Sequence, residues 1–330
     1  DASNNALAFS PERCPRLVVK IGSALLVDAD ASVRREWLAG LLDDVAERTR
    51  AGQRVVLVSS GAIALGARRL SLPKGGRASL EDAQAAAAAG QIILSHCYSE
   101  LLAERGIPAA QLLLTLDDLE DRRRFLNASA TLSRLLGLGA VPVINENDSV
   151  ATTEIRFGDN DRLAARVAQA AGATGVILLS DIDGLYTANP SSDPSATLVP
   201  RVARLDAQIM AMADDRSGSG LGSGGMISKL QAARIATRAG VALAIVTGKR
   251  PNPLAAFAAD GRGTLFEAVS GSGAKRAWLA GRLTVKGRTH VEAGAVAALA
   301  PGKTLPAAGA RSTEGRFSRG DVVDIVDVEG

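Results

Sequence analysis

Hydrophobic and polar positions along this chain follow two alternating spacings, one typical of buried strands and one of amphipathic helices. Short apolar runs bounded by Gly or Pro predict strands. Apolar residues that recur every three or four positions, as at Trp37, Leu38 and Leu41, predict helices between them. We predict strands at 16–21, 54–58, 111–115, 141–144, 176–179 and 241–246, and helices at 32–51, 62–70, 80–105, 122–137, 161–171, 202–213 and 229–239. Strands separated by helices favour a mostly parallel, doubly wound α/β sheet.

The segment 80–105 is unusual within this pattern because alanine dominates it and Gly90 interrupts it. Such a composition predicts one long helix or a pair of helices that meet near Gly90. Since no motif lies in this segment, we expect it to have a packing role only.

Composition changes near the C-terminal end of the chain. Residues 270–274 are rich in Gly and Ser, which predicts a linker. Short strand-like pieces follow at 282–285, 289–291 and 322–326. We therefore divide the chain into an irregular N-terminal segment at 1–15, an α/β domain at 16–270, and a linker with a small β-rich module at 271–330. The last strand is followed closely by the end of the chain, so we expect the module to be incomplete.

Charge and cysteine content exclude several classes of protein. The formal net charge is +3 over 330 residues, and no block of like charges marks a nucleic-acid arm. Cys14 and Cys97 are too few for a disulfide framework, and neither they nor His96 and His290 have partners at metal-ligand spacing. No apolar run reaches the roughly 20 residues of a membrane span, and no signal peptide is recognisable. We expect a cytoplasmic protein without a membrane or nucleic-acid partner.

The densest group of candidate functional side chains follows the predicted strand at 141–144. Carboxylates and amides occupy Asn145, Glu146, Asn147, Asp148, Asp159, Asn160 and Asp161. Ligands of doubly wound sheets bind beyond the carboxyl ends of the strands, which is where this group lies. The alternative is a polar surface loop with a turn at 158–159, because turns also favour Gly, Asn and Asp.

Two other predicted strands end in small residues that suit an anion. Lys20 is followed by Gly22, whose missing side chain lets backbone N–H groups approach a phosphate or carboxylate. Ser60 and Gly61 stand in the same position after the second strand, at the start of a predicted helix. A solvated lysine and an ordinary strand-to-helix turn are the alternatives, and the repetition of the pattern weighs against them.

A glycine-rich run at 217–225 leads directly into the predicted helix that carries Lys229. Its composition is also that of a flexible linker. A glycine-rich loop before a helix start and a lysine suits a nucleotide phosphate. Gly220, Gly222 and Gly225 fit the dinucleotide spacing, but no strand directly precedes them as that fingerprint requires. No complete Walker A motif occurs either, so a kinase would need another phosphate-binding architecture.

These motifs together resemble the glutamate 5-kinases of the amino-acid kinase superfamily, which carry a C-terminal PUA-like module. The matching stretches are 18–23, 58–66, 141–150, 157–161, 183–190, 220–233 and 317–320. The first two stretches and the Lys229 loop are shared widely among amino-acid kinases. The Asn-Glu-Asn-Asp and Gly-Asp-Asn-Asp stretches narrow the resemblance to glutamate 5-kinases. The resemblance implies phosphoryl transfer from ATP to the side-chain carboxylate of L-glutamate, the first step of proline biosynthesis.

The resemblance also implies a role for particular residues. Lys20, Lys229 and Asp161 would be catalytic, the two lysines flanking the transferred phosphoryl group and Asp161 orienting them. Glutamate would be bound by Ser60, Asp148 and Asn160, with backbone N–H groups near Gly22 and Gly61. The implied ATP-binding residues are Lys20, Ser180, Asp181, Ser223, Gly224, Gly225, Met226, Ile227, Ser228 and Lys229.

Cofactors and partners follow from the same resemblance. ATP and Mg²⁺ are expected, with the magnesium ligands left unassigned. Proline is expected as a feedback inhibitor, and the family forms dimers or tetramers. Another amino-acid kinase, acting on acetylglutamate, aspartate or a nucleoside monophosphate, remains an alternative, as does a non-catalytic RNA-binding protein on the same fold. The lysines and Asp161 argue against the second alternative.

Overall fold

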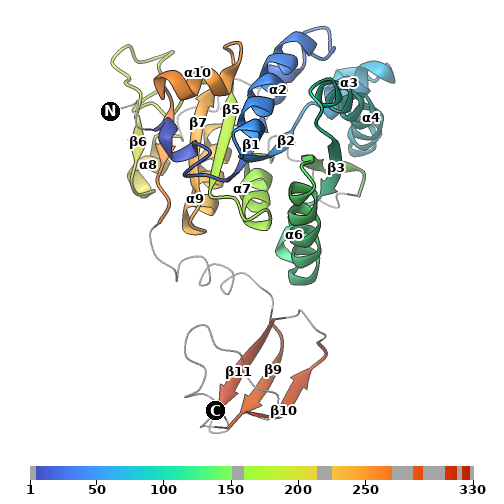
Figure 1. Ribbon diagram of the computed structural model, residues 1–330, viewed down its shortest axis with the longest axis vertical. Coiled ribbons are helices and arrows are strands. Elements are labelled where there is room, and N and C mark those ends of the chain that lie inside the picture. The colour runs from blue at the N-terminus through green and yellow to red at the C-terminus, as the bar shows by residue number, and fades with distance from the viewer. Residues whose placement is uncertain are drawn as a thin grey trace.

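The computed structural model describes residues 5–150, 160–213, 225–269, 285–292, 309–317 and 322–327. Its main body contains an eight-stranded sheet with the order β3-β4-β2-β1-β5-β7-β8-β6 (Figure 1). The strands are β1 Arg16–Ile21, β2 Arg54–Ser59, β3 Ala109–Leu114, β4 Val141–Glu146, β5 Gly175–Ser180, β6 Arg201–Val202, β7 Ala242–Thr247 and β8 Thr264–Phe266. All neighbouring pairs are parallel except β7 with β8. The predicted mostly parallel sheet is confirmed.

Helices cover both faces of this sheet. Successive residues of a strand point to opposite faces, so each buried strand contributes side chains to two hydrophobic cores. In β1, Leu17, Val19 and Ile21 face one hydrophobic core and Val18 faces the other. The longer helices are α2 Arg35–Arg50, α3 Ala62–Arg69, α4 Leu80–Glu104, α6 Arg122–Gly137, α7 Asn160–Ala170, α9 Met226–Arg238 and α10 Pro253–Asp260. Helices α2, α4 and α10 contribute to the first core, and α6, α7 and α9 to the second. The chain is therefore doubly wound.

Helix α4 is continuous through Gly90, where the sequence suggested a possible break. The glycine allows a close approach to α3. A Cβ atom at Gly90 would lie 1.6 Å from the carbonyl oxygen of Ala62, and one at Gly66 would lie 1.7 Å from that of Ala86. The backbones of α3 and α4 are thus in direct contact, and Gly90 serves packing between helices.

At the end of the α/β body one prediction was wrong and two elements were missed. Only Ala207–Ala211, helix α8, is helical within the predicted helix 202–213. Helix α10 and strand β8 were not predicted at all. Asn252, in the left-handed conformation, and Pro253 at the first turn start α10. Its body has only eight residues, too few to show a clear helical spacing.

The N-terminal residues pack against the α/β body. A 3₁₀ helix, η2 Ala6–Phe9, places Phe9 in the first core. The ring centroids of Phe9 and Phe257 are 6.0 Å apart. Gln53 holds this segment from the amino end of β2. It is buried, and its Nε2 donates hydrogen bonds to the backbone oxygens of Phe9, at 3.0 Å, and Cys14, at 2.7 Å.

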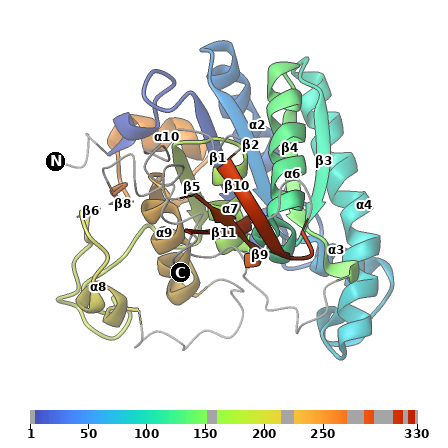
Figure 2. The ribbon, with the colours of Figure 1, turned by 90° about the horizontal axis from the view of Figure 1, so that it is seen from below.

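The C-terminal residues form a separate three-stranded sheet with the order β10-β9-β11, drawn in red in Figure 2. Its strands are β9 Val285–Val291, β10 Ala310–Gly315 and β11 Val322–Asp327. Strand β9 is antiparallel to β10 and parallel to β11. Strand β9 contains the end of the strand predicted at 282–285 and all of the strand predicted at 289–291. Residues 282–284 lie outside the described residues. Strand β10 was not predicted, and all of its side chains are exposed.

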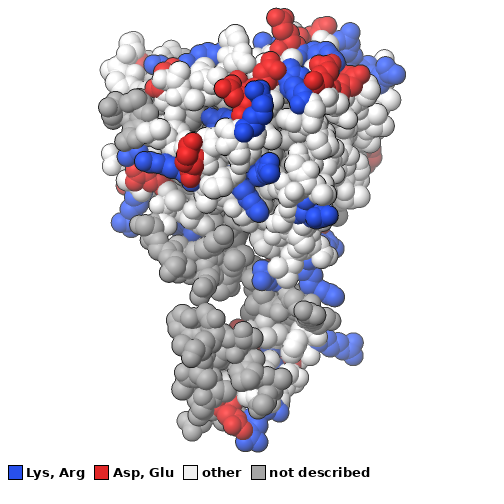
Figure 3. All heavy atoms as spheres, viewed as in Figure 1, with Lys and Arg blue, Asp and Glu red and all other residues white. Residues whose placement is uncertain are grey.

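Charges of both signs are interspersed on the face shown in Figure 3, along the edge formed by α2 and α4. Arg35 pairs there with Glu100, and Arg105 pairs with Asp43. Among the described residues, no helix is both long enough and apolar enough to span a bilayer.

Candidate active site

The carboxyl ends of the central parallel strands meet at one edge of the sheet, and backbone hydrogen bonds join them there. The N–H of Ser60, after β2, donates to the oxygen of Ile21 at 3.2 Å. The N–H of Gly22, after β1, donates to the oxygen of Leu179 in β5 at 3.3 Å. The N–H of Gly248, after β7, donates to the oxygen of Ser180 at 2.7 Å. The motifs of four separate strands are thus held together at this edge.

A buried carboxylate lies between two buried ammonium groups at this edge. Asp161, in the first turn of α7, is fully buried. Its Oδ1 is 2.8 Å from Nζ of Lys20, at the end of β1, and its Oδ2 is 3.2 Å from Nζ of Lys229, in α9. Both lysine side chains are at most 6% exposed. The three residues belong to three different elements, and each is at least 68 positions from the others along the sequence.

The electrostatics of this group follow from its burial. Burial alone would raise the pKa of Asp161, but the two ammonium groups outweigh it and hold that pKa below the ordinary 3.8. Burial lowers the pKa of Lys229 from 10.5, and the nearby charge of Lys20 lowers it further, while the carboxylates of Asp161 and Asp181 oppose the change. Asp161 thus helps to keep Lys229 charged in a site shielded from water.

Asn160, the residue before Asp161, joins the ends of β2 and β4. Its Nδ2 lies 2.9 Å from Oγ of Ser60, 3.3 Å from the backbone oxygen of Ser59 and 3.1 Å from Oδ1 of Asn145. Because Ser60 Oγ accepts from Asn160, the hydroxyl hydrogen of Ser60 is available to another acceptor. Ser60 and Asn160, both predicted as acceptor-binding residues, are therefore direct neighbours.

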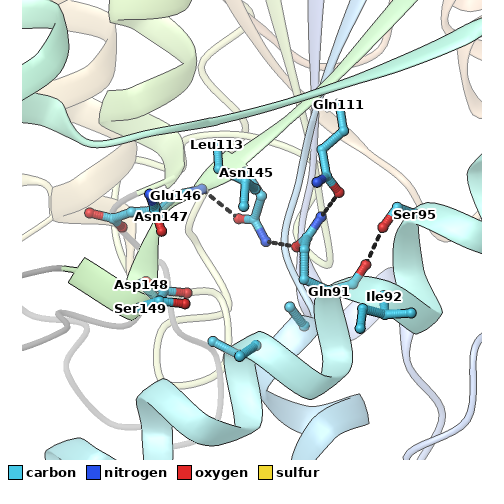
Figure 4. A pocket seen from close by; sticks show the side chains of 13 residues that line it. Gln91, Ile92, Ser95, Gln111, Leu113, Asn145, Glu146, Asn147, Asp148 and Ser149 are labelled. Carbon is cyan, nitrogen blue, oxygen red and sulfur yellow. Dashed lines mark hydrogen bonds between the residues drawn. The ribbon is translucent and has the colours of Figure 1, made fainter.

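A cavity of about 250 Å³ opens beside these residues (Figure 4). Asn145, Glu146, Asn147 and Asp148 line it from the end of β4, and residues of α4 line it from the other side. Asp148 is 9% exposed, and burial raises its pKa from 3.8 to about 6. A carboxylate that loses water in this way is suited to a ligand that brings a positive charge.

The two predicted glycines differ in what they contribute. Gly61 has φ +103°, a left-handed conformation that starts α3, and a Cβ there would lie 3.0 Å from Cγ2 of Val27. Gly22 has an ordinary conformation, and a Cβ there would lie 3.9 Å from Nζ of Lys20. A side chain at position 22 would therefore project towards the lysine.

Of the other residues predicted to bind the nucleotide, Asp181 is near enough to Lys229 for its charge to act on the pKa of that lysine. Ser180 is buried at the end of β5, and its Oγ donates to Oδ1 of Asp181 at 3.2 Å. Gly225 precedes α9, whose first turn contains 226–229, with Met226 buried and Ile227 exposed. Ser223 and Gly224 lie outside the described residues.

Helix α4 does more than pack, contrary to our expectation. Gln91 is 9% exposed and lines the cavity, where it hydrogen-bonds Asn145. Tyr98, seven positions later on the same helix face, is fully buried and its hydroxyl donates to Oγ of Ser59 at 2.9 Å. Polar side chains at helical spacing within an apolar face were the signal that could have identified this pair.

No group of three or more His, Cys, Asp or Glu residues that could hold a metal ion occurs in the described part of the chain.

Comparison with protein families gives two matches. Residues 15–248 match the amino acid kinase family, and residues 287–330 match the PUA domain. The matches leave residues 249–286 between them, and the predicted boundary after residue 270 stays a prediction.

Several bacterial proteins named glutamate 5-kinase are similar to almost the whole chain. The protein of Zymomonas mobilis subsp. mobilis is 63% identical over 328 residues, which cover 99% of this chain and 83% of the relative. The protein of Sphingopyxis alaskensis is 64% identical over 322 residues, covering 98% and 86%. The protein of Caulobacter vibrioides is 52% identical over 322 residues, covering 97% and 85%.

Solved structures with the same fold are more distant in sequence. Isopentenyl phosphate kinase has a TM-score of 0.51 at 18% identity, covering 76% of this chain and 99% of that one. UMP kinase from Ureaplasma parvum has a TM-score of 0.50 at 15% identity, covering 76% and 98%. These two likenesses concern the fold alone.

Proposed function

The chain belongs to the amino acid kinase family and groups within it with the glutamate 5-kinases, and from this premise we propose that it phosphorylates L-glutamate at the expense of ATP. An oxygen of the side-chain carboxylate attacks the γ-phosphorus of ATP, the bond to the β-phosphate oxygen breaks, and L-glutamyl 5-phosphate and ADP are formed. We place this reaction at the start of proline biosynthesis. The observation that carries the proposal is the buried group Lys20, Asp161 and Lys229, which Asn160 connects to a cavity lined by Asn145 and Asp148.

The acceptor site is supported by the chemistry of its side chains. L-glutamate carries an ammonium group and two carboxylates, and the buried carboxylate of Asp148 is a suitable partner for the ammonium. The hydroxyl of Ser60 offers a hydrogen-bond donor for a carboxylate, and Asn160 holds that hydroxyl in place by donating to its oxygen. Backbone N–H groups near Gly22 and Gly61 add further donors at the ends of β1 and β2.

The two lysines provide the charge that phosphoryl transfer between anions requires. Catalysis of such a reaction consists mostly of positioning and charge neutralisation, because the protein forms no bond to the transferred group. Lys20 and Lys229 would stabilise negative charge on the transferred phosphoryl group. Asp161 would hold both ammonium groups in place through charge-assisted hydrogen bonds.

The nucleotide would bind on the Lys229 side of the site. Ser180, Asp181 and the segment 223–229, at the start of α9, are the residues we assign to ATP. The N-terminus of a helix favours phosphate. Mg²⁺ would neutralise phosphate charge, and we expect it to bind as the nucleotide complex with few protein ligands.

Feedback inhibition and oligomeric state are part of the same proposal. Proline, the end product of the pathway, would act as a feedback inhibitor, and it resembles the substrate in carrying an amine and a carboxylate. We also expect a homo-oligomer, a dimer or tetramer.

The test is to follow ADP release from Mg-ATP with hydroxylamine present, which traps an acyl phosphate as a hydroxamate. L-glutamate, acetylglutamate, aspartate and UMP are compared as acceptors. ADP and hydroxamate with L-glutamate alone are expected. Turnover with another acceptor would change the substrate assignment and leave the lysine roles intact. A well-folded protein that turns over no acceptor would refute the proposed activity, and RNA binding would then be measured.

A further inference from the structure

Gln91, on the buried face of α4, connects two other amide side chains at the wall of the cavity (Figure 4). Its Oε1 accepts a hydrogen bond from Nδ2 of Asn145 at 2.8 Å. Its Nε2 donates to Oε1 of Gln111, in β3, at 2.9 Å. Gln91 and Asn145 are buried, so neither can exchange these partners readily for water.

The direction of these hydrogen bonds is set by one backbone group. The N–H of Glu146 can only donate, and it donates to Oδ1 of Asn145 at 2.8 Å. The Nδ2 of Asn145 must therefore face Gln91, which must offer its oxygen. The Nε2 of Gln91 is then left to donate to Gln111. Each amide in the chain has a single orientation that satisfies all of its neighbours.

The chain of amides continues into the proposed acceptor site. Oδ1 of Asn145 also accepts from Nδ2 of Asn160, which contacts Ser60 as well. If the Gln91 amide is removed, the N–H group of Asn145 that donates to it is left buried and without an acceptor. That situation favours displacement of the Asn145 side chain from its position. Displacement would draw Oδ1 of Asn145 away from Nδ2 of Asn160, which then has one acceptor fewer.

The backbone that carries Gln91 is held in place by the residue before it. Gly90 is in contact with Ala62, the first residue of α3, as described above. Helix α3 starts directly after Ser60 and Gly61. The position of Gln91 is therefore fixed relative to the end of β2, which is what a residue needs if it is to orient others.

We propose that Gln91 is a positioning residue that holds the Asn145 side chain in place and, through it, that of Asn160, and so controls affinity for the acceptor amino acid. It would do so without contact with the transferred phosphoryl group. This inference rests on the proposed function and extends it to a helix that carries none of the residues assigned to catalysis.

The test compares Gln91→Met, which keeps the length of the side chain, with Gln91→Ala, which suits the alanine-rich helix and only enlarges an existing cavity. Both remove the amide, so the test stands if one of them fails to fold. The KM for L-glutamate should rise roughly tenfold in each, as expected when one buried donor loses its acceptor. The kcat and the KM for ATP should change by less than about threefold, because the interaction lost is one of substrate binding.

Gln53→Met is the matched control. Gln53 is also a buried glutamine with several hydrogen bonds, but it lies at the amino end of β2, away from the site. This variant should lower the thermal unfolding temperature and leave the KM for L-glutamate unchanged. A double-mutant cycle with Asn145→Ala tests the route, since Gln91→Met should add little to the KM of a protein that already lacks the Asn145 amide.

Three results would overturn the inference: an unchanged KM for L-glutamate in a folded Gln91 variant, an equal rise in the KM for ATP, or additive effects in the cycle. A wild-type protein that does not phosphorylate glutamate would instead refute the proposed function, and the inference with it. The two failures are distinguished by the wild-type rate in the same series.

Discussion

Asp148→Asn tests whether a buried carboxylate binds the ammonium group of the acceptor. Asp148 is 9% exposed at the cavity wall, and burial raises its pKa to about 6. The substitution keeps the size of the side chain and removes its charge. Affinity for L-glutamate should fall, because a charged hydrogen bond contributes about 1.5–3 kcal/mol, which corresponds to roughly 10- to 100-fold in the dissociation constant.

The pKa also fixes how the wild-type affinity should depend on pH. With a pKa of about 6, roughly nine-tenths of the Asp148 side chains are ionised at pH 7 and about one-tenth at pH 5. Glutamate keeps its ammonium group and most of its side-chain charge over this range. The dissociation constant of the wild type should therefore rise about tenfold from pH 7 to pH 5, while that of Asp148→Asn should change little.

The same pKa predicts an opposite effect on stability. A carboxyl group whose pKa is raised on folding binds protons more tightly in the native state, so stability falls as the pH rises from 3.8 to about 6. The shift of about two pKa units corresponds to at most about 3 kcal/mol at pH 7. Without glutamate, Asp148→Asn should therefore be more stable than the wild type at pH 7, by up to this amount.

Isothermal titration calorimetry with L-glutamate between pH 5 and pH 8, and urea unfolding at pH 7, measure both effects. A variant that gains stability and loses affinity would show that Asp148 is kept for binding. The reasoning would be refuted if Asp148→Asn bound glutamate as the wild type does, or if both proteins showed the same dependence on pH.

Three further predictions concern charge and packing. Lys229→Ala should lower kcat, measured by ADP release, about 100- to 1,000-fold with little change in glutamate affinity, and a near-normal rate would remove Lys229 from the mechanism. Asp161→Asn should also lower kcat. Because the pKa of Asp161 lies below 3.8 in the folded protein, the wild type should lose stability as the pH falls below that value. Asp161→Asn should lose less stability in an acid titration followed by circular dichroism, and an equal loss in both proteins would contradict this. Gly90→Ala should destabilise the fold in urea by roughly 3 kcal/mol or more, since its Cβ would meet the backbone of Ala62. Gly137→Ala, in α6 with nothing within 4 Å of its Cβ, is the control and should be neutral or slightly stabilising.

The central strands could be predicted from the sequence because each is a short apolar run between a helix and a small or polar residue. The predicted strand at 16–21 is β1 to the residue, and the helix predicted at 122–137 is α6. The same logic identified the site, because parallel strands place their carboxyl ends at one edge of the sheet. Lys20, Ser60 and Asp161 could thus be grouped without knowledge of any distance.

The hydrogen-bonded contribution of α4 could not be predicted in this way. The spacing of Gln91 and Tyr98 on an apolar helix face marks them as buried polar residues, but their partners lie 20 or more positions away, and no local pattern identifies those partners. The role of Gly90 was hidden for the same reason, since it depends on the backbone of a neighbouring helix. Helix α10 and β8 were missed because short elements give too few positions to define a spacing.

Under the proposed function, the start of α7 would bring the acceptor and the phosphoryl group together. Asn160 contacts Ser60 and Asn145, which we assign to the acceptor side, and the next residue, Asp161, contacts both lysines, which we assign to the phosphoryl side. Two consecutive residues of one helical turn have a fixed separation, whereas two loops would not. Reactions that depend on positioning lose rate steeply when the reacting groups are misplaced. In the proposed mechanism the distance between acceptor and phosphoryl group would therefore be set by this single helical turn, and substitutions that shift α7 should lower kcat even where every contacting side chain is kept.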